Sequence, residues 1–214
     1  MTKRNSNSVA NSFAGSLISD VIEALAAWNK QPSPARGRNL VRTVFSAIEG
    51  FSWLYRNHVT GVARDIDILT SEEEAALAEQ VHSVSERGKI IRQSRFIPLT
   101  AMLRLTTRIA VRLDPALVVR FDGLGWQQFQ DAAKIRNRIT HPKREVDLNV
   151  SEQDIATCLA AFEWLMTTAI NGMGSAQAAL KSHSQELQRL VEALKSGDKA
   201  ALAEYQAAAA ALNA

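Results

Sequence analysis

The chain has 214 residues, 46% of them hydrophobic and 22% charged, which are values typical of a globular protein and not of a disordered one. Its single cysteine, Cys158, excludes an intrachain disulfide framework and a thiolate metal site, and we expect a small buried core residue there. We expect neither a signal peptide nor a membrane-spanning segment, because the longest uncharged stretch, 164–180, is diluted by polar residues. A cytoplasmic location follows from these expectations.

Positive charge is concentrated in the middle of the chain. The net charge is only +3, but residues 87–144 contain 13 Lys or Arg against three acids, a local balance of +10 that leaves −7 for the rest. Such an asymmetry favours a polyanionic partner for this segment. The alternative is a solvated basic face whose neutralising acids come from other helices.

The first half of the chain predicts two long helices. Residues 1–8 are expected to be disordered. Apolar residues recur at three and four positions over 9–29, which predicts a first helix that ends in a Pro-rich loop at 31–37. A second helix is predicted over 38–62, with its apolar face in the core.

Local end signals define the next helices. Thr70, followed by Ser-Glu-Glu-Glu, predicts the capped start of a third helix that reaches about Val84. Pro98 opens a fourth helix that closes after Leu113, before an Asp-Pro pair. A fifth helix is predicted over 126–140.

A sixth helix begins at Ser151, which is followed three residues later by Asp154 as in a capping box. It runs at least through Met166, and we expect Gly172 and Gly174 to bend it.

The end of the chain is Ala-rich. It predicts two helices, over 185–195 and 199–212, that are broken at 196–198 and form an arm for packing or oligomerisation. The predicted fold is therefore all-α: an up-and-down bundle of four to five core helices over 9–175, with a C-terminal Ala-rich helical arm over 176–214.

The fourth helix carries a stripe of like charges. Arg104, Arg108 and Arg112 fall four residues apart, where repulsion between like charges costs helix stability. This arginine stripe therefore requires an acidic neighbour or a bound phosphate chain, and its members are candidates for RNA binding.

The fifth helix places an arginine in its apolar face. On a helical wheel, Trp126, Phe129 and Ile135 belong to a broad apolar arc with Arg136 close to its middle. Arginine is almost never fully buried without a partner. Arg136 therefore either pairs with a carboxylate or faces a cleft or interface that binds an anion. Glu49, at the edge of the second helix, is a candidate partner, and a solvated glutamate is the other interpretation.

His141 ends the same helix. Pro142 disfavours helical geometry at His141, so the imidazole should lie at the unwinding end, free to turn toward Arg136. Imidazole serves as acid and base near neutral pH, and guanidinium suits phosphate. With Asn137 as a neutral donor and acceptor, the three residues fit metal-independent cleavage of RNA by a ribose 2′-hydroxyl. We find no cluster with metal-ligand spacing in the sequence.

The nonet from Ile135 to Lys143, IRNRITHPK, resembles the signature of HEPN domains. That signature is an arginine, a following polar residue, and a histidine four to six residues after the arginine. The aromatic approach WQQF at 126–129 and the core helix at 40–50 are also similar to that family. The resemblance covers roughly residues 9–175, and the nonet is its specific part.

The resemblance implies a helical bundle that forms a homodimer with two motif helices facing each other. In catalytic members of the family the paired residues form one metal-independent endoribonuclease site, without a cofactor. By position, Arg136 would stabilise the transition state, His141 would be the acid and base, and Asn137 would position them or the substrate. Many such proteins are toxins or antiviral defence effectors, so an antitoxin or regulatory protein is a further expected partner.

Three more basic residues are candidates for RNA binding: Arg138, Lys143 and Arg144, for which solvated side chains are the alternative. The segment 56–58, Arg-Asn-His, imitates the composition of the motif but not its spacing, and we interpret it as ordinary helix surface.

Three functions stay open from the sequence. The first is the dimeric endoribonuclease. The second is a non-catalytic RNA-binding or adaptor protein of the same fold that uses the arginine stripe. The third is a helical interaction protein whose partner docks on the C-terminal arm, in which Arg136 is only a structural ion pair.

Overall fold

The computed structural model describes residues 12–212, which form helices and one two-stranded hairpin. The expected disordered start and the first residues of the predicted first helix lie outside the described residues. Helix α1 (Phe13–Lys30) is followed by α2 (Pro34–Asp65). The prediction of a loop through residue 37 was wrong, because the hydroxyl of Ser33 accepts a hydrogen bond from the backbone N–H of Arg36 and caps α2 earlier.

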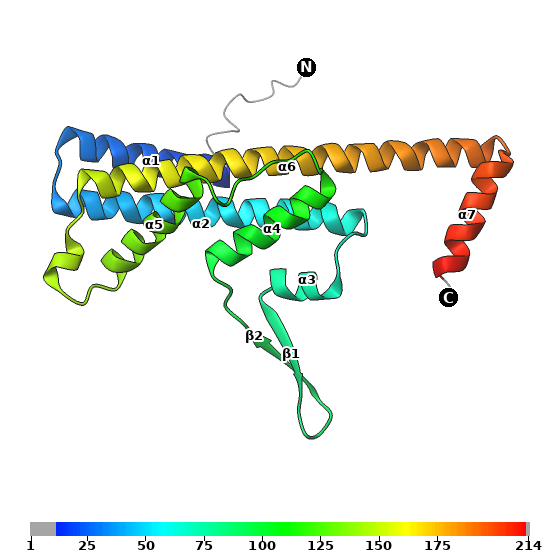
Figure 1. The fold of residues 1–214 in the computed structure, drawn as a ribbon, viewed down its shortest axis with the longest axis horizontal. Helices are drawn as coiled ribbons and strands as arrows, with labels where there is room; N and C mark the ends of the chain where they lie inside the picture. The colour runs from blue at the N-terminus through cyan, green and yellow to red at the C-terminus, as the bar shows by residue number, and fades with distance from the viewer. Residues whose placement is uncertain (1–11, 213–214) are drawn as a thin grey trace, which may run out of the picture.

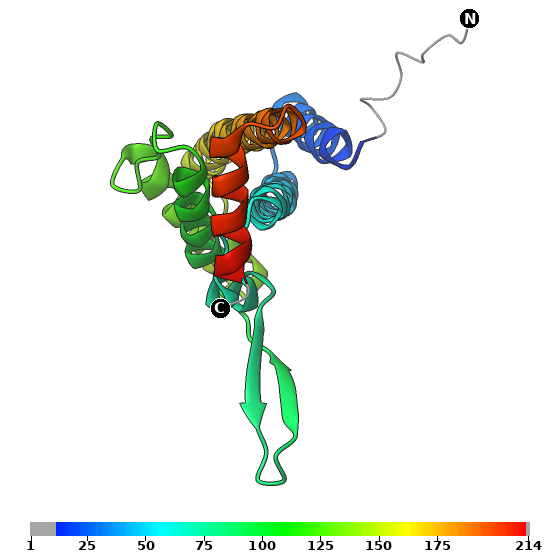
Figure 2. The same cartoon turned by 90° about the vertical axis from the view of Figure 1, so that its right-hand side faces the viewer.

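The bundle is organised around two long helices. Helices α2 and α6 (Glu152–Lys195) pack along each other, with α1 on one side and with α4 (Leu99–Leu113) and α5 (Leu124–Thr140) on the other (Figures 1 and 2). The short helix η1 (Glu145–Leu148) connects α5 to α6. Large apolar side chains from these helices fill the core, among them Leu40, Val44, Ile48, Phe129 and Leu165. The predicted all-α bundle is confirmed.

A β-hairpin interrupts the helices. Helix α3 (Ser71–Leu77) ends seven residues earlier than the predicted Val84, and β1 (Gln80–Val84) pairs antiparallel with β2 (Ile90–Ser94). The prediction failed because Glu79 adopts a positive φ of 52°, which ends the helical path, and because the β-branched residues that follow favour a strand. Figure 2 shows the hairpin extending away from the helices.

Helix α6 runs unbroken through both glycines that were expected to bend it. Gly172 is needed for close packing, since a Cβ there would lie 2.5 Å from the hydroxyl of Tyr55 on α2. Nothing lies within 4 Å of a Cβ at Gly174.

The arm begins as a continuation of the bundle. The expected boundary between residues 175 and 176 falls inside α6, which extends beyond the other helices (Figure 1). The predicted break at 196–198 is confirmed, with Gly197 at a φ of +77°, and α7 (Lys199–Leu212) follows it. None of the helices within residues 12–212 has both the length and the apolar character that crossing a membrane requires.

Candidate functional site

Helices α5 and α2 bring Arg136 and Glu49 together. Nη2 of Arg136 donates a hydrogen bond to Oε1 of Glu49 at 2.9 Å, and Nη1 donates to Oδ1 of the neighbouring Asn137 at 3.2 Å. The side chains of Arg136 and Glu49 are 32% and 52% exposed, so the pair lies at the surface and not in the core. The carboxylate partner considered from the sequence is therefore present.

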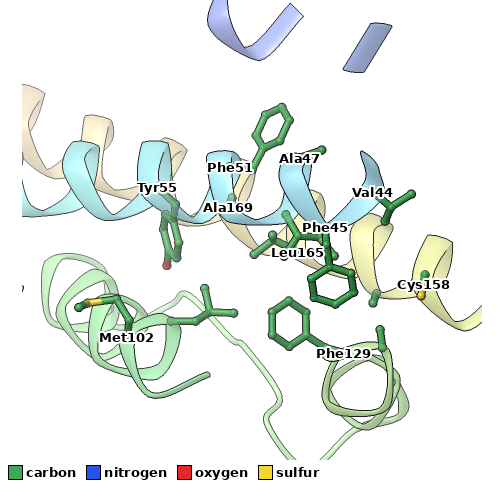
Figure 3. Close-up of a cluster of buried hydrophobic side chains, with 14 of the residues drawn as sticks. Val44, Phe45, Ala47, Phe51, Tyr55, Met102, Phe129, Cys158, Leu165 and Ala169 are labelled. Carbon is green, nitrogen blue, oxygen red and sulfur yellow. The ribbon is translucent and has the colours of Figure 1, made fainter. Parts of the chain in front are cut away.

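This pair lies at one side of a pocket of about 590 Å³ between α2, α4, α5 and the connection that follows β2. Apolar side chains form part of the lining. Figure 3 shows the rings of Phe45 and Phe129 between α2 and α5, and Met102 of α4 also lines the pocket. A concave, largely apolar site with a few polar groups is the usual form of a binding site.

A second ion pair also lines the pocket. Nη1 of Arg56 is 3.6 Å from Oε2 of Glu79, and Oε1 of Glu79 accepts a hydrogen bond from the backbone N–H of Ile97 at 3.2 Å. Glu79 thereby connects α2 to both ends of the hairpin. The side chain of Arg56 is only 19% exposed, so the interpretation of residues 56–58 as ordinary helix surface was wrong for Arg56. It missed that Arg56 lines the pocket.

The sequence carried one overlooked signal for this lining. Phe45, Glu49, Ser52 and Arg56 are spaced by four, three and four residues, which places them on one face of α2. Three polar residues on the face that also packs the core indicate a site. Glu79 had no comparable signal, because only the hairpin brings it next to α2.

His141 caps the end of α5 with φ −124° and ψ 60°, as expected for a residue before proline, and its backbone N–H still donates to the carbonyl of Asn137. Its imidazole is exposed and has no hydrogen bond or ion pair with any described residue. His141 is not among the residues that line the pocket. Within one chain, the structure therefore brings together Arg136, Asn137 and Glu49, but does not add His141 to them.

The arginine stripe is partly neutralised within the chain. Arg112 donates two hydrogen bonds to Glu73 of α3, at 2.8 and 2.6 Å, and these bonds lower the pKa of Glu73. The guanidinium of Arg104 lies 4.9 Å from the ring centres of both Phe121 and Trp126. Arg108 is exposed and has no direct contact of this kind with the described residues.

Of the basic residues around the motif, some are ion-paired within the chain and one is exposed. Arg138 is held by Asp154 at 3.0 Å and by the carbonyl of Asn149 at 2.7 Å, and Arg144 lies 3.5 Å from Asp147. The side chain of Lys143 is exposed. Acids from other elements thus neutralise part of the basic middle of the chain, in line with the alternative to a polyanionic partner.

Positive charge without an internal partner gathers on the hairpin. Residues 80–95 carry four basic residues and one acid, Glu86, and none of the four basic residues forms an ion pair within the described residues. These hairpin cations are Arg87, Lys89, Arg92 and Arg95.

Other chemistries find little support in the described residues. Cys158 is buried, and desolvation together with the Asp154 carboxylate raises the pKa of its thiol to about 12, so it is no nucleophile. Between residues 12 and 212, no group of three His, Cys, Asp or Glu side chains could hold a metal ion.

The fold and site define a mostly helical bundle with a pocket that is lined by two ion pairs, and an exposed histidine at the end of a helix that contributes to the pocket. No family model matches the chain, and neither a curated protein nor a solved structure does.

Proposed function

We propose that this protein is a metal-independent endoribonuclease that cleaves RNA at a composite site formed by two copies of the chain. One observation carries the proposal. Arg136 and Asn137 lie at the side of a pocket, and His141 follows at the end of the same helix with an exposed imidazole. The resemblance of the nonet to the HEPN signature supports the same chemistry.

The contacts of Arg136 suit a phosphate. Glu49 and Asn137 orient the guanidinium from two sides, and a guanidinium with five N–H donors keeps others for phosphate oxygens. Arg136 would hold the scissile phosphate and stabilise the charge that develops on it. Asn137 would keep the guanidinium in place.

His141 would move the protons. One imidazole accepts the proton of the ribose 2′-hydroxyl as its oxygen attacks phosphorus, and the bond from phosphorus to the 5′-oxygen breaks. An imidazolium gives its proton to the leaving 5′-oxygen. The products are a 2′,3′-cyclic phosphate and a 5′-hydroxyl, and no water or metal is consumed.

A second copy supplies what a single chain lacks. Because His141 does not line the pocket beside Arg136, we propose that two α5 helices face each other so that each chain contributes to a shared site. A toxin or antiviral defence effector acting in the cytoplasm, controlled by an antitoxin or regulatory protein, fits such an activity.

The test is cleavage of end-labelled RNA in excess EDTA by the wild type, His141→Ala and Arg136→Ala, with analysis of the product ends. The expected result is cyclic phosphate ends from the wild type and none from either variant. His183→Ala, which changes a histidine on the arm, is the control and should cleave like the wild type. Equal cleavage by all four proteins would refute the proposal.

The second candidate is a non-catalytic RNA-binding or adaptor protein. The observation that favours it is that Arg108 of the arginine stripe is exposed and has no hydrogen bond or ion pair within the described residues, so that it is available to RNA phosphates. This function predicts salt-sensitive RNA binding without cleavage products.

A further inference from the structure

The pocket beside Arg136 has an aromatic rim. Trp53 on α2 and Phe96, which follows β2, both line it, and they are 49% and 83% exposed. The ring of Trp53 packs edge-on against Phe13 of α1, with the ring centres 6.2 Å apart. Flat aromatic faces are the common platform on which unpaired nucleic-acid bases stack.

A buried hydroxyl in the same lining has no partner. Ser52 is only 7% exposed, and its Oγ forms no hydrogen bond within the described residues. A buried polar group without a partner costs free energy, which a bound molecule with a donor or acceptor would recover. This observation is independent of the aromatic rim.

The charges of the pocket indicate which part of a nucleotide it suits. Arg136 and Arg56 are each paired with a glutamate, so the interior is nearly balanced and suits a flat, neutral group better than a cluster of phosphates. The unbalanced positive charge lies outside, on the hairpin cations defined above. The hairpin cations therefore attract the phosphate backbone of a nucleic acid, while an uncharged group such as a base can enter the pocket.

We infer that the pocket binds one unpaired base of single-stranded RNA, next to the phosphate held by Arg136. The base stacks on Trp53 and Phe96, and the hydroxyl of Ser52 bonds to its edge. A base within a duplex cannot enter, so the substrate is single-stranded. The choice of RNA rests on the proposed function, but the pocket can be tested without cleavage.

The experiment measures binding in the His141→Ala background in EDTA, where no RNA is cut. Fluorescence anisotropy of a labelled 12-nucleotide single-stranded RNA, and of the same RNA annealed to its complement, gives the two affinities. We expect Trp53→Ala to weaken single-strand binding roughly tenfold or more while changing duplex binding little. Trp53→Phe keeps a stacking face and should restore most of the affinity.

Two further variants make the result specific. Phe96→Ala removes the more exposed ring. It replaces Trp53→Ala in the binding assay if circular dichroism shows that Trp53→Ala melts at a lower temperature than the parent. Tyr205→Ala removes a ring of similar exposure on α7, far from the pocket in sequence, and should bind like the parent.

Each outcome separates this inference from the proposed function. If Trp53→Ala and Phe96→Ala bind single strands like the parent, the base pocket is refuted even when the wild type cleaves RNA. If both weaken binding but the wild type cuts nothing, the endoribonuclease fails and the pocket stands. If light scattering shows that the variants change the oligomeric state and not the RNA affinity, the rim is an interface between copies and the inference is overturned.

Discussion

Glu49 and Arg136 are joined by a 2.9 Å ion pair although 87 residues separate them in the chain. The pair connects α2 to α5 at the side of the pocket, and both side chains are partly exposed. Exposed ion pairs contribute little to stability because solvent screens them. The placement of this pair therefore suits a role in binding better than a role in holding the bundle together.

Arg136→Ala should separate these two roles. We expect the free energy of unfolding to fall by no more than about 1 kcal/mol, and RNA cleavage to fall at least roughly 100-fold because the developing phosphate charge loses its donor. Urea titration and a cleavage assay measure the two effects. Lys134→Ala breaks an exposed pair on the same helix and should change neither. A large loss of stability with cleavage intact would identify Arg136 as purely structural.

The two glycines of α6 should respond differently to the same change. In Gly172→Ala the new Cβ meets the ring of Tyr55, which must shift, so we expect a loss of about 1–3 kcal/mol. Gly174→Ala meets nothing and should be neutral or add up to about 1 kcal/mol, because alanine favours the helix. Chemical denaturation compares them. Equal effects would show that the contact with Tyr55 is not limiting.

Within the arginine stripe, Arg104 and Arg108 offer a matched pair. Arg104→Ala should cost about 0.5–1 kcal/mol, because it removes a cation from two aromatic faces. Arg108→Ala should be close to neutral, since it removes no direct contact and its relief of repulsion within the stripe offsets the lost Coulombic attraction to Glu73. Urea midpoints decide between them. If Arg108→Ala is the more destabilising variant, the assignment of contacts along the stripe is wrong.

The bond between Arg112 and Glu73 predicts a dependence on pH. The pKa of Glu73 is lowered in the folded state. Its charged form therefore stabilises the protein at pH values above its ordinary pKa of 4.5. That contribution is lost as the pH falls through the lowered value. Wild type should therefore exceed Glu73→Gln in stability at pH 7, by no more than about 1 kcal/mol, and the two should converge at strongly acidic pH. Thermal melts across this pH range test it, with Glu86→Gln, which removes a hairpin carboxylate outside the ion pairs of the described residues, as the control.

Cys158 should be unreactive in the native protein. Its thiol is buried and its pKa is raised to about 12, so little thiolate exists at pH 8. Labelling with an aromatic disulfide reagent should be at least roughly 100-fold slower in buffer than in concentrated urea. Rapid labelling of the folded protein would contradict this and show that the segment around Cys158 opens in the native state.

The ends of several helices could be predicted because they depend on neighbours in the sequence. Thr70 caps α3 and Ser151 forms a capping box at the start of α6, as expected, and α4 ends at Leu113 before Asp-Pro. These signals are hydrogen bonds and steric limits within four residues, so no distant part of the chain is needed to read them.

The hairpin could not be predicted in the same way. Its strands are short, exposed and without the alternation that marks a half-buried strand. Glu79, whose positive φ ends the helical path, is anchored by Arg56 of α2 and by the backbone of Ile97. Those contacts exist only once the bundle has formed.

By itself, the sequence determined the helical fold and the candidate chemistry. It placed Arg136, Asn137 and His141 on one helix, since periodicity and the Pro142 stop are properties of neighbouring residues. Only the tertiary structure decided that Glu49 pairs with Arg136, that Arg56 and Ser52 share their pocket, and that His141 lies outside it. The reason is physical: a helix face is set by local spacing, whereas a pocket is set by which faces pack together, and that choice depends on the free energy of the whole core.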